Sequence, residues 1–257
     1  MKKHNLLFTV LIFVTALLVM PSTQIQAQDL TADEIVKKAD EKFRGQSSEG
    51  LMRMSIVRPK WERTIEMKSW SLGTEYFMVY ITAPAREKGQ AYLKRENEMW
   101  QWLPSIERMV KLPPSMMMQS WMGSDFTNDD LMQESSIVRD YEKELTGTEM
   151  LQGYECHKIK LTPKPEAVVV WDKIILWVSK NEFYQLRADY YDEFGDLVQT
   201  MTGSNIKVLD DRKLPATLTI EPADKPGHKT ILEYVEMDFD IEIEASFFSQ
   251  QRMKRLH

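Results

Sequence analysis

The sequence has a single cysteine, Cys156, and only four histidines among its 257 residues. One cysteine excludes an internal disulfide and any site built from several thiolates, such as a structural zinc or iron–sulfur site. The chain also lacks a basic surplus, because 39 acidic residues outnumber 33 lysines and arginines and give a formal net charge of −6. Since nucleic-acid-binding domains usually carry the opposite balance, we expect no nucleic-acid partner.

The common catalytic and nucleotide-binding motifs are absent as well. The sequence has no G-x-S-x-G elbow, H-E-x-x-H pair, P-loop or G-x-G-x-x-G loop. Cys156 and His157 are neighbours on a predicted strand, so their side chains point to opposite faces and do not form a dyad. Asp125, Asp129 and Asp130 lack the D-x-D-x-D-G spacing of a calcium loop. We therefore expect no enzyme activity, cofactor or metal, although paired carboxylates leave a glycan or lipid hydrolase open.

Residues 1–27 have the pattern of a cleaved secretory signal peptide. Lys2 and Lys3 precede an apolar core over residues 6–20, and Ala27 offers a small residue for cleavage. The alternative is a membrane anchor, but this uncharged segment of 15 residues falls short of the roughly 20 that span a bilayer as a helix. We expect residues 28–257 to form one domain that is soluble in a bacterial periplasm.

The rest of the chain reads as a helix followed by many short strands. Residues 29–44 carry apolar side chains at helical spacing, Thr31 and Glu34 form a capping box, and Gly45 ends the helix. Strands are expected where polar and apolar residues alternate between turn residues. They are residues 51–57, 64–72, 76–82, 90–94, 99–103, 108–112, 155–161, 174–178, 186–191, 197–208, 216–221 and 229–235.

This pattern predicts a mainly β fold with a few helices. Short strands at regular intervals favour one antiparallel sheet curled into a barrel or half-barrel. Helical segments are confined to the two ends and the middle, including a short helix over residues 245–256. No linker divides the chain.

The middle of the chain is rich in methionine and tryptophan. Seven methionines and three tryptophans fall within residues 99–132. Methionine is flexible and repacks around variable apolar partners. Consecutive methionines cannot all face one core, so we expect a pliable lid over an apolar cavity; an ordinary loop is the alternative. The lid residues are Met116, Met117, Met118, Trp121 and Met122. Ser124 or Asp125 is expected to cap a short helix after it.

Several islands of sequence resemble the outer membrane lipoprotein-sorting protein family, in the LolA-like branch associated with RND/MMPL transporters. The strongest match is Gly123-Ser124-Asp125-Phe126 with Asp130-Leu131. Trp102-Leu103-Pro104, Arg108 and Leu214-Pro215 add support. The similarity covers essentially all of residues 28–257.

The resemblance implies a strongly curved antiparallel sheet that forms an open, incomplete β-barrel of LolA/LppX type, with helices plugging its concave side. It implies a carrier of lipid or lipoprotein acyl chains between an inner-membrane transporter, of RND/MMPL or Lol type, and an outer-membrane acceptor. We expect a monomer. A lipid-sensing regulatory protein on the same fold is the main alternative.

Twelve apolar strand residues are candidates for the lining of such a cavity, with an ordinary filled core as the alternative. They are Met52, Met54, Ile56, Ile65, Met67, Phe77, Val79, Ile81, Trp100, Trp102, Leu176 and Val178.

Overall fold

The computed structural model describes residues 30–96, 98–132, 136–167 and 169–256. The predicted signal peptide therefore lies outside the described residues. The chain enters the described part through helix α1 (Ala32–Arg44). The predicted capping box is present, because the Thr31 hydroxyl accepts from the Glu34 amide and the Glu34 carboxylate accepts from the Thr31 amide. Gly45 caps the end of α1 with φ +69°, a conformation that favours glycine.

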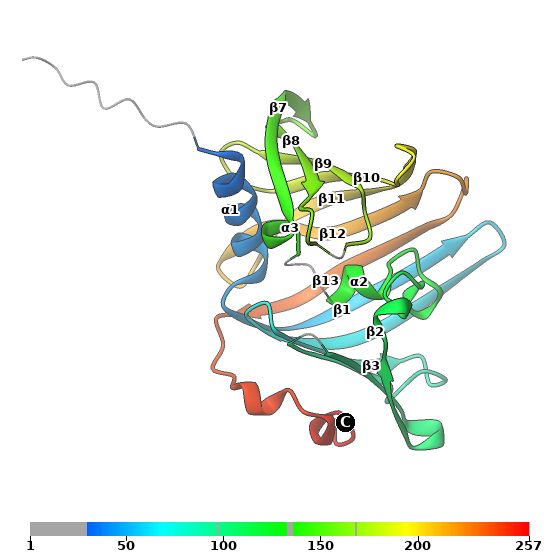
Figure 1. The fold of residues 1–257 in the computed structure, drawn as a ribbon. Coiled ribbons are helices and arrows are strands. Elements are labelled where there is room, and N and C mark those ends of the chain that lie inside the picture. Colours follow the sequence, from blue (N-terminus) through cyan, green and yellow to red (C-terminus); the bar gives the residue numbers. More distant parts are fainter. Residues whose placement is uncertain (1–29, 97, 133–135, 168, 257) are drawn as a thin grey trace, which may run out of the picture.

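All strands belong to one antiparallel, strongly curved sheet that is not closed, as the sequence predicts (Figure 1). Their order is β6-β5-β4-β3-β2-β1-β13-β12-β11-β10-β9-β8-β7. The strands are β1 (Ser47–Arg58), β2 (Trp61–Leu72), β3 (Tyr76–Ala83), β4 (Ala91–Arg95), β5 (Glu98–Leu103), β6 (Arg108–Leu112), β7 (Tyr141–Leu151), β8 (Tyr154–Pro163), β9 (Lys173–Ser179), β10 (Gln185–Tyr191), β11 (Leu197–Leu209), β12 (Arg212–Pro222) and β13 (Lys229–Phe239).

Short helices fill the connection between the two edge strands, β6 and β7. They are the 3-10 turns η2 (Pro114–Met116) and η3 (Trp121–Gly123) and the helices α2 (Asn128–Met132) and α3 (Ser136–Arg139). Another 3-10 turn, η1 (Pro104–Ile106), joins β5 to β6. We call residues 113–132 the plug. Figure 1 shows α1, α3 and α2 along the same side of the curved sheet.

Side-chain alternation explains why this face is apolar. On β1 and β2 the inward pairs Met52–Met67 and Met54–Ile65 are almost fully buried, whereas Arg53 and Glu66 between them point to solvent. Such cross-strand pairs are the unit that stabilises a sheet. The same face continues onto β12 and β13 and packs against Trp121 and Phe126 of the plug.

The other face of strands β2 to β5 is covered by the end of the chain. The 3-10 turn η4 (Ala245–Phe247) and helix α4 (Gln250–Met253) place Phe248 and Met253 against Met78 and Leu93. A single helix over residues 245–256 was expected, but the non-helical Phe248 separates two short pieces.

Strand β7 is the one strand that the sequence pattern misses. Ten consecutive positions of β7, after the buried Tyr141, are exposed or half-buried, so it lacks the alternation that marks a half-buried strand. β7 is an edge strand that pairs only with β8. Charged side chains such as Glu142 and Glu144 are typical of such edges, because they discourage pairing with other chains.

No helix among the described residues is both long and apolar enough to cross a membrane.

We predict that the C-terminal cover is an integral part of the fold. Phe248 is fully buried and its ring lies 5.5 Å from that of Tyr76. Phe248→Ala should lower the free energy of unfolding by about 3–5 kcal/mol, because it leaves a cavity in this cluster. Urea denaturation checks this, with the exposed Gln250→Ala as control. Equal stability of the two variants would contradict it.

Candidate functional site: an apolar cavity closed by the plug

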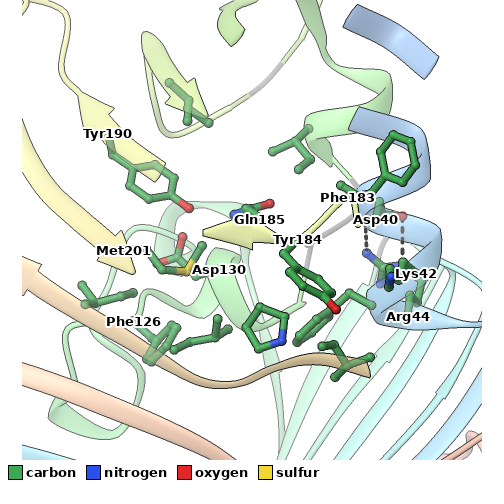
Figure 2. A pocket seen from close by; sticks show the side chains of 18 of the residues that line it. Asp40, Lys42, Arg44, Phe126, Asp130, Phe183, Tyr184, Gln185, Tyr190 and Met201 are labelled. Carbon is green, nitrogen blue, oxygen red and sulfur yellow. Dashed lines mark hydrogen bonds and ion pairs between the residues drawn. The ribbon is translucent and has the colours of Figure 1, made fainter. Parts of the chain in front are cut away.

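A cavity of about 120 Å³ lies inside the described fold. Its walls come from α1, the plug, α3, the first residue of β7 and strands β9 to β12 with the connections before β9 and β10 (Figure 2). Met201 of β11 packs against both of the large core clusters of this face, so the cavity marks their junction. The lining residues are Ala39, Asp40, Lys42, Phe43, Arg44, Phe126, Asp129, Asp130, Ile137, Tyr141, Trp171, Ile174, Phe183, Tyr184, Gln185, Tyr190, Met201, Leu214, Pro215, Leu218 and Ile220.

Three charged residues of α1 line the cavity. Asp40 and Arg44 pair with each other, whereas Lys42 lies 3.5 Å from Glu182. Arg44 binds Asp40 through two contacts, Nη2 to Oδ1 at 2.7 Å and Nε to Oδ2 at 3.3 Å, and both side chains are largely buried. Figure 2 shows this pair on the side of the cavity opposite Phe126 and Met201. The cavity therefore has an apolar wall and a paired, charged rim.

Two carboxyl groups of α2 also line the cavity. Burial, reinforced by the neighbouring Asp130, raises the pKa of Asp129 to about 6 from its usual 3.8. Burial likewise raises the pKa of Asp130, whose carboxylate accepts from the Thr127 amide at 2.8 Å. Lys94 of β4 does not line the cavity but is also buried. Burial lowers its pKa to about 8, and its ammonium donates to the Thr74 carbonyl at 2.7 Å.

The cap of α2 differs from the expectation. The Thr127 hydroxyl accepts a hydrogen bond from the Asp130 amide at 3.0 Å, and the Asp130 carboxylate accepts one from the Thr127 amide. These two bonds form a capping box. The expected caps, Ser124 and Asp125, serve elsewhere: Ser124 donates to the Trp121 carbonyl at 2.7 Å. The sequence signal for this cap was Thr127, a short polar residue three positions before the acidic Asp130.

Asp125 is instead held by Arg58 at the end of β1. The guanidinium donates to both carboxylate oxygens, at 2.9 and 3.0 Å, and to the Gly123 carbonyl at 3.1 Å. Thr230 of β13 adds its hydroxyl to Asp125 Oδ2 at 2.7 Å. Both charged side chains are about nine-tenths buried, and such two-point, charge-assisted pairs are strong and specific in geometry. We call these contacts the latch.

An open groove of about 1190 Å³ lies outside the cavity. It is bordered by the latch residues, by Met118 and by the connections that precede β9, β11 and β13. Phe126 and Trp171 line both the groove and the cavity, and both are nearly buried. These two rings therefore separate the interior from the groove.

The predicted lid residues lie in the plug but differ in their surroundings. Trp121 is buried in the concave core and Met122 packs against it, whereas Met118 is 55% exposed. Met116 and Met117 pack against Met99 and Leu112. Consecutive methionines thus face different surroundings, as the sequence implies. Their action as a lid stays a prediction.

The family motif forms the turn that carries the latch. Gly123 has φ +78°, a conformation that favours glycine, and Ser124 and Phe126 are buried. The Trp121 amide donates to the Phe126 carbonyl at 2.8 Å and closes the turn. Leu131 lies in α2. Because Asp125 turns to the latch and Asp130 to Thr127, the motif's acids do not converge.

None of the twelve predicted lining residues borders the cavity. Eight of them build or border the adjoining concave core, namely Met52, Met54, Ile56, Ile65, Met67, Phe77, Val79 and Ile81. Leu176 and Val178 pack beneath α1. Trp100 and Trp102 share one face, as expected, but it is the face covered by the C-terminal segment. Those two are corrected by the structure, since alternation alone does not tell which face is concave.

Most of the residues that line the cavity carry no local sequence signal for that role. Phe43 sits on α1, while Met201 and Leu218 come from strands that were predicted but not assigned to a face. The Leu214-Pro215 match was a usable signal, because both residues line the cavity. Cys156 does not line the cavity; it is fully buried in a separate core cluster with Trp177, Tyr184 and Leu186.

Among the described residues, no three His, Cys, Asp or Glu side chains gather as a metal site would require.

A family model described as "Uncharacterized protein" matches residues 73–255. The chain belongs to this family. No curated protein matches it. Three solved structures share its fold over nearly the whole of their own length, which confirms the predicted resemblance to lipoprotein-sorting proteins and the predicted fold class.

A DUF1329 family protein from Desulfovibrio piger is 24% identical, with a TM-score of 0.79, over 86% of this chain and 97% of its own. A putative outer membrane lipoprotein-sorting protein domain from Vibrio parahaemolyticus is 22% identical, with a TM-score of 0.77, over 87% and 98%. A LolA superfamily protein from Nitrosomonas europaea is 26% identical, with a TM-score of 0.75, over 86% and 99%.

We predict that Asp129 makes the protein more stable in mild acid. A carboxyl whose pKa is raised by folding binds its proton more tightly when folded, so its contribution is full below about pH 4 and is lost as pH rises through about 6. Asp129→Asn should remove this dependence and raise the free energy of unfolding at pH 7 by about 1–2 kcal/mol.

Urea denaturation at pH 4, 5, 6 and 7 measures this effect. The exposed Asp211→Asn is the control, because it makes the same chemical change in the turn between β11 and β12. Parallel stability curves for wild type and Asp129→Asn would show that the carboxyl is not perturbed.

Proposed function

We propose that the protein is a non-enzymatic periplasmic carrier that holds acyl chains of a lipid or lipoprotein on the concave side of its sheet. It would receive this cargo from an inner-membrane transporter and pass it toward an outer-membrane acceptor. The observation that carries the proposal is an apolar cavity closed by a plug, which contacts the sheet through Trp121, Phe126 and the buried Arg58–Asp125 ion pair. The likeness to a LolA superfamily protein supports a lipid-binding role.

The size of the cavity implies that loading requires movement. An apolar cavity of roughly 150 Å³ holds one benzene molecule, so about 120 Å³ is too small for a long acyl chain. The plug has to leave its place for a chain to enter. Its core contacts, chiefly Trp121 and Phe126, would then be replaced by contacts with the chain.

The groove is the natural entrance. Phe126 belongs to the plug, whereas Trp171 precedes β9, so displacing the plug separates the two rings. The groove's apolar border, which includes Met118, Val169 and Leu197, then becomes continuous with the cavity. A headgroup would stay in the wide polar part of the groove while its chains pass inside.

The energetics suit a carrier better than a storage protein. Moving an acyl chain of ~16 carbons into water costs on the order of 12 kcal/mol, at ~0.8 kcal/mol per methylene. A membrane already avoids this cost, so the protein needs only a matching apolar interior to make extraction nearly neutral. Each loading event also displaces plug contacts, which limits the affinity and permits release.

We predict that blocking the cavity abolishes lipid retention. Met201→Trp places a larger ring at the junction of the two core clusters, where the empty volume lies. Native mass spectrometry of purified protein, followed by lipid extraction, should show acyl lipid on wild type and little on this variant.

The matched control is Met150→Trp, the same exchange on edge strand β7, where the methionine is 65% exposed. It should retain lipid like wild type. Equal lipid content in all three proteins, or none in wild type at saturating phospholipid, would contradict the acyl-chain site.

We predict that weakening the latch speeds transfer. Arg58→Gln combined with Asp125→Asn leaves no unpaired buried charge, which on its own would cost roughly 3–5 kcal/mol. The rate of transfer of a fluorescent phospholipid from loaded protein to acceptor vesicles should rise about tenfold, which corresponds to about 1.4 kcal/mol less barrier.

The control exchanges an exposed ion pair between β1 and β2, Arg53→Gln with Glu66→Gln, whose charged atoms lie 3.5 Å apart. Exposed pairs contribute little, so its rate should match wild type. Absence of transfer from wild type would favour a lipid-sensing protein instead of a carrier.

A further inference from the structure

Two neighbouring acids of the plug, Asp129 and Asp130, line the cavity from helix α2. Asp130 lies on the apolar side of the cavity with Phe126 and Met201 (Figure 2). Carboxyl groups that face an apolar space beside a second acid are costly to ionise, because they lose water and the two charges repel each other. The charge on the plug therefore depends on whether the plug is seated against the cavity.

The Asp129 carboxyl also lacks a partner that would stabilise its charge. Within the described residues, no hydrogen bond or ion pair binds this carboxyl, although the Asp129 amide donates to the Met117 carbonyl at 3.0 Å. Asp130 is better satisfied, since its carboxylate accepts from the Thr127 amide at 2.8 Å. Burial nevertheless raises the pKa of both acids. The seated plug thus favours their protonated forms.

The groups that face Asp129 from other elements do not remove this preference. Lys94 of β4 favours the ionised form of Asp129, whereas Asp130 and Asp140, which precedes β7, disfavour it. Tyrosines are uncharged at neutral and acidic pH, which applies to Tyr141, Tyr184 and Tyr190 of the lining. Nearby charged residues of the other helices are held in ion pairs, namely Asp40, Lys42 and Arg44 of α1 and Arg139 of α3. The net effect is to favour a proton on Asp129.

Displacement of the plug would change the charge of these acids. In the carrier function proposed above, an acyl chain enters only when the plug leaves its place, and α2 moves out with it. Outside the cavity the two carboxyl groups would regain water and ionise near their usual pKa. Because the seated plug binds these protons more tightly than the displaced plug, protons stabilise the seated state. Protonation of the plug and loading of the cavity therefore oppose each other.

We propose that Asp129 and Asp130 make the plug a proton-controlled closure, in which protonation seats the plug and favours release of the acyl chain, and ionisation favours loading. Loading gives up to two protons to the solvent, and release takes the same protons back. This inference rests on the proposed carrier function and adds a condition for release to it. The protein holds its cargo at neutral pH and yields it in mild acid.

The two pKa values of Asp129 set the size and the pH range of the effect. With a pKa of about 6 in the seated plug and the usual 3.8 outside it, linkage predicts that the affinity for an acyl chain falls about tenfold from pH 7 to pH 5. Asp130 acts in the same direction, since burial also raises its pKa. Lys94 stays mostly charged over this range because its pKa is about 8.

Equilibrium partition of pyrene-labelled phosphatidylcholine between the protein and phosphatidylcholine vesicles tests the proposal. The charges of this headgroup do not change between pH 5 and 7, so a pH effect belongs to the protein. Partition toward wild type should fall about tenfold from pH 7 to pH 5. Asp129→Asn cannot ionise, so it should bind the probe more weakly than wild type at pH 7 and lose most of the pH dependence.

Asp211→Asn is the matched control, because Asp211 is exposed in the turn between β11 and β12. It should keep the affinity and the pH dependence of wild type. A double variant, Asp129→Asn with Asp130→Asn, should show no pH dependence between pH 5 and 7. A dependence that persists in the double variant would assign the effect to other groups and overturn the proposal.

Carbon-13 NMR of protein labelled at the aspartate carboxyl carbons follows the proton directly. The Asp129 signal, identified by its absence from Asp129→Asn, should titrate near pH 6 without lipid and at lower pH, toward 3.8, in loaded protein. If loading leaves this titration unchanged, or if wild type binds the probe equally at pH 5 and 7, the proposal fails while the carrier function stands. If wild type binds no probe at any pH, the carrier function fails as well.

Discussion

The position of the plug depends on the contact between Arg58 and Asp125. This contact joins the plug to the β1–β13 pair, where the strands that precede the plug in the chain, β1 to β6, meet those that follow it, β7 to β13. Arg58 stands at the end of β1, and Thr230, which also binds Asp125, stands on the neighbouring β13. A buried ion pair adds little net stability compared with an apolar pair of the same shape, but it demands one geometry. The ion pair therefore specifies the position of the plug while adding little to the free energy that holds it there.

Asp129, Arg44 and Asp40, which line the cavity, are likewise buried ionisable groups. Asp129 is held in a site that favours its protonated form, while Arg44 and Asp40 neutralise each other at the rim. In the carrier function that we propose, these groups would regain water whenever the plug leaves, which would offset the cost of burying them.

Much of the fold could be predicted from the sequence, because alternation on β1 and β2 and the capping box of α1 are local signals. Strand β7 escaped because an exposed edge has no alternation to detect. The twofold period also does not say which face is concave, which is why Trp100 and Trp102 were assigned to the wrong side. The latch could not be predicted, since Arg58 and Asp125 are 67 positions apart and nothing local pairs them.

The position of the plug in the chain has a mechanical consequence. It lies in the connection between β6 and β7, the two unpaired margins of the sheet. Among its described residues, every backbone-to-backbone hydrogen bond stays within the plug itself. Within the described chain, the plug shares no backbone-to-backbone hydrogen bond with the sheet. Its contacts with the sheet involve side chains on at least one side, such as Arg58 with the Gly123 carbonyl. The loading movement that we propose would therefore break no strand pairing and would leave the thirteen-stranded sheet intact.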